Sequence, residues 1–185
     1  ENLIDYMLLN FYCGNRDWDD HNWYAGRRRE PGAGYKFFAW DSERSLENIT
    51  GDNRTGVGQD NKPSRFYAQL KENPEFVMQF ADRAHKALFN DGVFSPRQTA
   101  GRYQELVNAV RLAIVGESAR WGDARRADPY TRDAEWDTER NRLINQYFPD
   151  RTEALLGHLR GHTPALYPSV DAPVFSQHGG YLSSA

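Results

Sequence analysis

Two short aromatic runs on either side of a turn sequence constrain the fold of this chain more than any other feature. The first run extends from Trp23 to Gly26 and the second from Tyr35 to Trp40, with Pro31 to Gly34 between them. Aromatic residues favour strands, and a segment rich in Pro and Gly favours a turn. The pattern predicts a β-hairpin near the start of the chain.

An amphipathic stretch precedes the predicted hairpin. From Leu3 to Cys13 the apolar residues recur at helical spacing, and Gly14 with Asn15 supplies a stop signal. The segment from Asn15 to Asn22 is polar and rich in acidic residues. We therefore expect a buried helix that leads into a polar loop at the base of the hairpin.

The remainder of the chain predicts a helical body. Residues 41–63 are rich in Gly, Asn, Asp, Ser and Thr and lack periodicity, which is typical of a long and often functional loop. The expected helices then span Ser64 to Glu72 with Ser64 as cap, Pro74 to Phe89, Ser95 to about Glu117, Thr131 or Asp133 to Tyr147, and Asp150 to Leu159, with Pro149 at the last junction. The predicted fold class is α+β, mainly helical, with one domain over residues 1–163 and an irregular tail over residues 164–185.

Composition limits the classes of partner. The chain has 185 residues, 14% aromatic residues and a formal net charge of -3, which together indicate one folded domain without the basic surface of a nucleic-acid binder. No apolar stretch is long enough for a membrane span. The first residues include neither a basic region nor an initiator Met, so we expect a processed product or part of a longer chain.

Acidic residues gather at both ends of the predicted hairpin. A hairpin that returns beside its starting loop would bring Asp17, Asn22 and Asp41 within reach of one metal ion, and oxygen ligands of this kind suit Mg²⁺ that shares its shell with phosphates. The alternative is a structural turn in which these side chains cap backbone N–H groups. Asp19 and Asp20 are predicted to be solvated loop charges.

The spacing of the first two candidates matches that of a known catalytic loop. Four residues separate Asp17 from Asn22, as they separate the Asp that accepts the hydroxyl proton from the metal-binding Asn in protein kinases. Such a pair also arises by chance, so its context decides. Here a helix precedes the pair, and a strand that ends in Asp41 follows it.

These segments resemble the CotH-type spore-coat protein kinases, an atypical branch of the protein-kinase-like fold. The resemblance rests on Asn15-Arg16-Asp17-Trp18, on Asn22-Trp23-Tyr24 and on the strand from Tyr35 to Glu43. It extends to the segment from Glu117 to Asp123 and covers most of the chain up to about Pro173.

The resemblance implies a set of roles and partners. Asp17 would be the catalytic Asp, Asn22 and Asp41 would bind the nucleotide through Mg²⁺, and Glu43 occupies a place where many relatives carry a second acidic ligand. The implied reaction is transfer of the ATP γ-phosphoryl group to Ser or Thr of a coat or surface protein, in the spore coat or at the cell surface. The chain would be the C-terminal lobe, inactive without an N-terminal lobe that carries the phosphate-covering loop.

Two other functions remain open at this point. One is a non-enzymatic domain that assembles coat or surface proteins, and the other is a metal-dependent phosphoester hydrolase that uses Asp17 and Asp41. The run from Arg27 to Arg29 would bind a phosphate or an acidic substrate, although a solvated turn is the commoner meaning. Glu117, Arg120 and Asp123 are predicted to form buried charge pairs at a helix junction.

Overall fold

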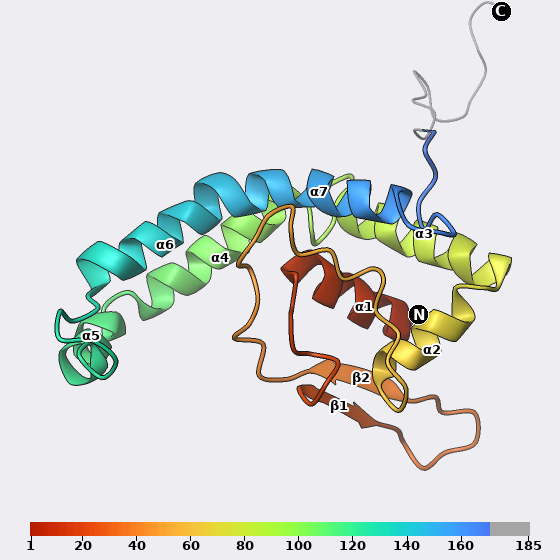
Figure 1. Cartoon of the computed structure of the whole chain (residues 1–185), viewed down its shortest axis with the longest axis horizontal. Helices are drawn as coiled ribbons and strands as arrows, with labels where there is room; N and C mark the ends of the chain where they lie inside the picture. Colours follow the sequence, from red (N-terminus) through yellow and green to blue (C-terminus); the bar gives the residue numbers. More distant parts are fainter. Residues whose placement is uncertain (171–185) are drawn as a thin grey trace, which may run out of the picture.

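The structure, a computed structural model, describes residues 1–170 and is mainly helical (Figure 1). Its elements follow the chain in the order α1 (Asn2–Cys13), β1 (Trp23–Gly26), β2 (Lys36–Ala39), α2 (Pro63–Leu70), α3 (Pro74–Leu88), α4 (Pro96–Val110), α5 (Ala113–Trp121), η1 (Arg132–Trp136), α6 (Asp137–Arg142), η2 (Leu143–Tyr147) and α7 (Phe148–Arg160). The elements η1 and η2 are single π-helical turns.

Helix α1 is the centre of the hydrophobic core. In Figure 1 it lies between the hairpin on one side and α3 with α7 on the other. Its apolar stripe is buried, and Phe11 packs edge-on against Tyr67 of α2 with ring centroids 5.4 Å apart. The predicted helix from Leu3 to Cys13 is confirmed, because its apolar residues are buried against the neighbouring elements.

The predicted hairpin is confirmed. Strands β1 and β2 pair antiparallel with Trp23 opposite Ala39 and Tyr24 opposite Phe38. The side chain of Asn2 in α1 accepts a hydrogen bond from the backbone N–H of Phe37 at 2.6 Å, and the Phe37 ring stacks on Tyr6 at 5.7 Å. The hairpin is thereby held against α1.

Helices α2 and α3 lie close to their expected positions, but the cap of α2 differs. Ser64 is the second residue of α2, and its backbone N–H donates to Oδ1 of Asp19 at 3.0 Å. The prediction that Ser64 caps this helix was wrong, because a carboxylate distant in sequence caps it. Helix α3 begins at Pro74 as expected, and the Asn73 side chain accepts from Glu75 N at 2.9 Å.

The expected single helix from Ser95 to about Glu117 is two helices. The chain breaks between α4 and α5 at Arg111 and Leu112, where the Arg111 guanidinium grips both carboxylate oxygens of Asp137. A periodic pattern records local sequence only, so it does not reveal a tertiary ion pair that redirects the chain.

Helices α4, α5 and α6 form an arm that projects from the body (Figure 1). No residue of α5, η1 or α6 is buried. Glu117, Arg120 and Asp123 are all exposed, so the prediction of buried charge pairs among them was wrong. The arm has too little covering structure to bury them.

One uninterrupted helical segment extends from Arg132 through η1, α6, η2 and α7 to Arg160. The predicted junction at Pro149 was wrong, because Pro149 is the second residue of α7. The wide turn η2 directly precedes it, and a turn of this kind shifts the backbone bonding so that a residue without an N–H is tolerated.

The chain beyond α7 still contributes to the core. Leu166 and Tyr167 are buried, and Leu166 N donates to Leu159 O at 2.9 Å. A domain boundary at residues 163 and 164 stays a prediction. Most of the expected tail, residues 171–185, lies outside the described residues.

Candidate active site

The end of α1 delivers the loop that carries Asp17. Helix α1 stops at Gly14, which has a left-handed φ of 59°, and Asn15 N then donates to Asn10 O at 3.1 Å. A Cβ at Gly14 would lie 2.7 Å from Cβ of Asp52. The residue must therefore be glycine for two independent reasons.

Asn15 fixes the backbone at Asp17. It is buried, donates through Nδ2 to Oδ1 of Asn10 at 3.1 Å, and accepts through its own Oδ1 from Asp17 N at 3.3 Å. Oδ1 of Asp17 is buried and has no hydrogen-bond partner among residues 1–170. A buried carboxylate oxygen without a donor lacks the hydrogen-bond partner that such an atom normally has.

The two ends of the hairpin meet directly. Asn22 is 6% exposed, and its Nδ2 donates to the backbone carbonyl of Asp41 at 3.1 Å. Asp41 follows β2 with a positive φ of 46°, and its side chain is exposed. The structure therefore brings Asn22 to the backbone of Asp41, while the convergence of the Asp17, Asn22 and Asp41 side chains on one metal ion stays a prediction.

The segment after Asp41 returns beside the loop that carries Asp17. Arg16 N donates to Arg44 O at 3.0 Å, and Leu46 N donates to Cys13 O at 2.7 Å. The pKa of Arg44 is raised, first by its hydrogen bond to Glu47 and also by the negative charges of Asp17 and Glu43. These two carboxylates therefore act on the same guanidinium.

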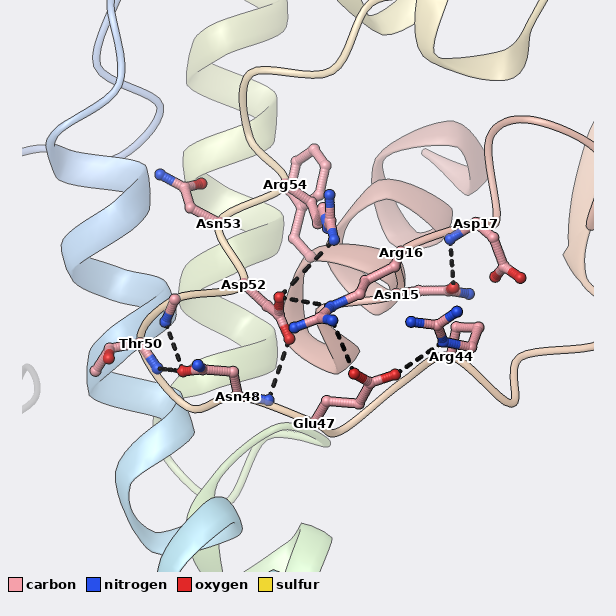
Figure 2. A network of polar contacts seen from close by, with 12 residues as sticks. Asn15, Arg16, Asp17, Arg44, Glu47, Asn48, Thr50, Asp52, Asn53 and Arg54 are labelled. Atoms are coloured by element: carbon pink, nitrogen blue, oxygen red, sulfur yellow. Dashed lines mark hydrogen bonds and ion pairs between the residues drawn. The ribbon is translucent and has the colours of Figure 1, made fainter. Parts of the chain in front are cut away.

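A polar network secures this arrangement (Figure 2). Nε of Arg16 donates to Oδ1 of Asp52 at 3.0 Å, and its NH1 pairs with Glu47 at 2.9 Å. Asp52 is 4% exposed and also accepts from Asn48 N at 3.1 Å. In Figure 2 the carboxylate of Asp17 points away from this network, so Arg16 holds the loop while the Asp17 side chain remains uncommitted.

Arg151 of α7 supports the network through hydrogen bonds to backbone carbonyls. It is fully buried and donates to the backbone carbonyls of Phe11, Tyr12, Ile49 and Asp52. The first two carbonyls belong to the last turn of α1, where Phe11 O also accepts from Gly14 N at 3.2 Å and Tyr12 O also accepts from the Tyr147 hydroxyl at 3.0 Å. Arg151 therefore joins the end of α1 to the loop after the hairpin.

Asp19 and Asp20 have different roles from each other. Asp20 is exposed and pairs with Lys62 at 3.1 Å, as expected of a solvated loop charge. Asp19 is 4% exposed and accepts from the backbone and side chain of Ser64, so the prediction of a solvated charge there was wrong. Burial raises the pKa of Asp19, while the hydrogen bonds from Ser64 lower it.

The outer face of the hairpin is aromatic and exposed. Tyr24 and Phe38 form a cross-strand pair and are 68% and 51% exposed, and Trp40 beside Asp41 is 66% exposed. At the far end, residues Arg27 to Arg29 are exposed, and Arg27 lies over the Tyr35 ring at 5.5 Å. This placement favours a solvated turn for the arginine run.

The donor set fits a hard cation that shares its shell with a phosphate. Asn22 offers one amide oxygen, and Asp41 and Glu43 offer exposed carboxylates in the segment that follows β2. Within residues 1–170 no group of three or more His, Cys, Asp or Glu side chains forms a self-sufficient metal centre. Substrate oxygens would have to complete the coordination shell.

Sequence reasoning did not identify Asn15, Arg16 and Asp52 as positioning residues. Asn15 and Arg16 stand directly before Asp17, and their proximity to it is the only signal that the sequence offers. Asp52 lies in a loop in which Asn, Asp and Gly are abundant, and nothing in that pattern separates it from its neighbours.

The fold and the site define a mainly helical protein in which a hairpin joins a loop that carries Asp17 and Asn22 to a segment that begins with Asp41 just after β2. The chain belongs to the CotH kinase family, because residues 1–155 match the family described as CotH kinase protein. No curated protein and no solved structure shows a significant match. Within residues 1–170 no helix has the length and apolar character needed to cross a membrane.

Proposed function

We propose that the chain supplies the catalytic loop and the metal-binding residues of a protein kinase that transfers the γ-phosphoryl group of ATP to Ser or Thr of a protein. Family membership supports phosphoryl transfer as the class of reaction. The single observation that carries the assignment of residues is the hydrogen bond from Asn22 to the carbonyl of Asp41, which joins both ends of the hairpin at one point.

Asp17 is the proposed general base. Its backbone is fixed by Asn15, and its buried Oδ1 has no donor among the described residues, so that oxygen is free to accept the proton of a substrate hydroxyl. A general base of this kind contributes about 10²- to 10⁴-fold to the rate.

Asn22 and Asp41, with Glu43 beside them, are the proposed ligands of Mg²⁺. The metal would neutralise the charge on the nucleotide phosphates, and the chain's own task is to hold these oxygens in place. Arg44 stands beside Asp17 and Glu43 and balances their charge before any metal binds.

We further propose that transfer needs a phosphate-covering lobe in addition to these 185 residues. The sheet of the described residues has two strands, and Gly32 and Gly34 lie in its connecting turn. Neither glycine is followed by a helix, and Lys36, two residues after Gly34, lies in β2, the strand before Asp41, which is not the place of the phosphate-binding lysine of a kinase. A protein of the coat or cell surface is the proposed substrate, and the spore coat or the cell surface the proposed location.

The experiment compares Asp41→Ala with Asp82→Ala in the protein that includes this chain and its preceding sequence. Asp82 is an exposed residue of α3, so its replacement removes one surface charge without reaching the site. With radiolabelled ATP and casein as acceptor, we expect Asp41→Ala to lower kcat/KM by about a hundredfold or more and Asp82→Ala to leave it unchanged.

Thermal melts of both variants check that the fold is retained. Full activity of a folded Asp41→Ala protein would contradict the proposal. Phosphoester hydrolysis by the chain without ATP would indicate the hydrolase, and coat or surface assembly that is unchanged in Asp41→Ala would indicate the assembly domain.

A further inference from the structure

A shallow pocket of about 410 Å³ lies at the tip of the arm. Figure 1 shows that this tip and the hairpin lie in different parts of the molecule. The lining of the pocket has two components with different chemistry. The aromatic members are Trp121, Tyr130 and Trp136, and the acidic members are Glu117, Glu135 and Glu139. Among residues 1–170 no lysine or arginine lines the pocket, although Arg126 and Arg142 pair with two of its carboxylates.

Gly122 allows the chain to fold back and form the wall of the pocket. The loop after α5 folds back so that Tyr130 N donates to Gly122 O at 2.9 Å. A Cβ at Gly122 would lie 2.5 Å from the carbonyl oxygens of Ser118 and Tyr130, so only glycine permits this close return. The return places Tyr130 and Trp121 in the wall of the same pocket.

Two carboxylates of the pocket have partners in the protein, and one is uncommitted. Hydrogen bonds from the backbone N–H of Thr131 and from Arg126 lower the pKa of Glu135 to about 2. Glu139 pairs with Arg142 at 2.6 Å. Glu117 makes no hydrogen bond or ion pair within residues 1–170.

The aromatic rings of the arm already act as cation acceptors. The guanidinium of Arg120 lies 5.0 Å from the ring centroid of Trp121, and that of Arg126 lies 3.9 Å from the centroid of Tyr130. Both distances are within the range of attraction between a cation and a ring. Trp121 is nevertheless 54% exposed, so ring surface remains for a further ligand.

We propose that this pocket binds an arginine side chain of a basic segment in a partner protein. A planar guanidinium can stack on Trp121 and donate two hydrogen bonds to the carboxylate of Glu117, which an ammonium group cannot do in the same way. A purely apolar occupant would cover the Glu117 carboxylate without giving it a partner. The binding does not depend on phosphoryl transfer.

The test measures binding of a dye-labelled, N-acetylated tetra-arginine peptide to the 185-residue chain by fluorescence anisotropy. The matched variants are Glu117→Gln in the pocket and Glu105→Gln on the exposed face of α4, since both remove one negative charge. We expect Glu117→Gln to raise Kd about threefold or more and Glu105→Gln to leave it nearly unchanged. Trp121→Leu should weaken binding comparably.

Two comparisons separate the pocket from general attraction to an acidic protein. A tetralysine peptide should bind about threefold or more weakly than tetra-arginine. Equal effects of Glu117→Gln and Glu105→Gln, or equal affinity for the two peptides, would overturn the proposal. Circular dichroism melts confirm folding, and Glu117→Gln keeps the test decisive if Trp121→Leu disturbs the tip.

Discussion

Arg151 shows how one side chain can organise several segments of this protein. Its guanidinium is fully buried and bonds only to neutral backbone carbonyls, among them Tyr12 O at 2.7 Å and Asp52 O at 2.9 Å. Buried carbonyls without donors cost free energy, so the guanidinium and its acceptors depend on one another.

Arg151→Met is expected to lower the free energy of unfolding by about 3 kcal/mol or more, because Ile49 O and Asp52 O would lose the arginine as donor while Phe11 O and Tyr12 O would each keep one other donor. Arg151→Lys should recover little of this loss, since one ammonium group cannot reach all of them. Urea denaturation monitored by circular dichroism measures both variants.

Arg102→Met, an exposed change on α4, is the control and should alter stability by less than about 0.5 kcal/mol. A similar loss in Arg102→Met and Arg151→Met would show that the buried arginine has no special structural role.

At this scale the sequence predicts residues that carry a local signal and misses those that act through tertiary contacts. The spacing of Asp17 and Asn22 is visible in the sequence, and in the structure the Asn22 side chain donates to the backbone carbonyl of Asp41. The burial of Asp19 and the pairing of Arg16 with Asp52 depend on segments that are about 36 or more positions apart and leave no periodic trace.

At the scale of elements, Gly116 and Gly122 lie six positions apart and differ in whether the structure has room for a side chain. Gly122 lies against two carbonyl oxygens at the end of α5, whereas a Cβ at Gly116 within α5 meets no atom within 4 Å. The two positions therefore separate a packing requirement from helix propensity.

Gly116→Ala should raise the free energy of unfolding of the helix by about 0.5–1 kcal/mol, because alanine favours helical backbone. Gly122→Ala should lower it by about 1–3 kcal/mol, because the added methyl group forces the returning loop apart. Urea melts of the two variants, measured under identical conditions, provide the comparison. Stabilisation by both alanines would refute the close approach at Gly122.

The elements that the sequence predicts correctly are those whose pattern and packing agree. The hairpin has aromatic residues that pack on α1, and α3 has both a cap and an apolar stripe. The break between α4 and α5 and the continuity through Pro149 were not predicted. Both depend on an ion pair or a wide turn that sequence periodicity does not encode.

At the scale of the whole molecule, stability is distributed unevenly. The body contains the buried residues of α1 and the second half of α7, whereas α5 and α6 contain none. A region with few buried apolar side chains opens at low free-energy cost.

Hydrogen exchange should therefore be about a hundredfold or more faster for amides of α5 than for amides of α1. Mass spectrometry of peptides after timed deuterium labelling measures both regions in one sample. Equal protection in the two helices would contradict an arm that opens independently of the body.

The uninterrupted helix from Arg132 to Arg160 has a mechanical consequence. One end of this helix lies at the tip of the arm, and the other end lies in the core. Near its middle, Arg142 donates a hydrogen bond to Leu46 O at 2.6 Å. Leu46 follows closely on Asp41 and Glu43. The tip of the arm is thus joined, through Arg142, to the segment that carries both carboxylates.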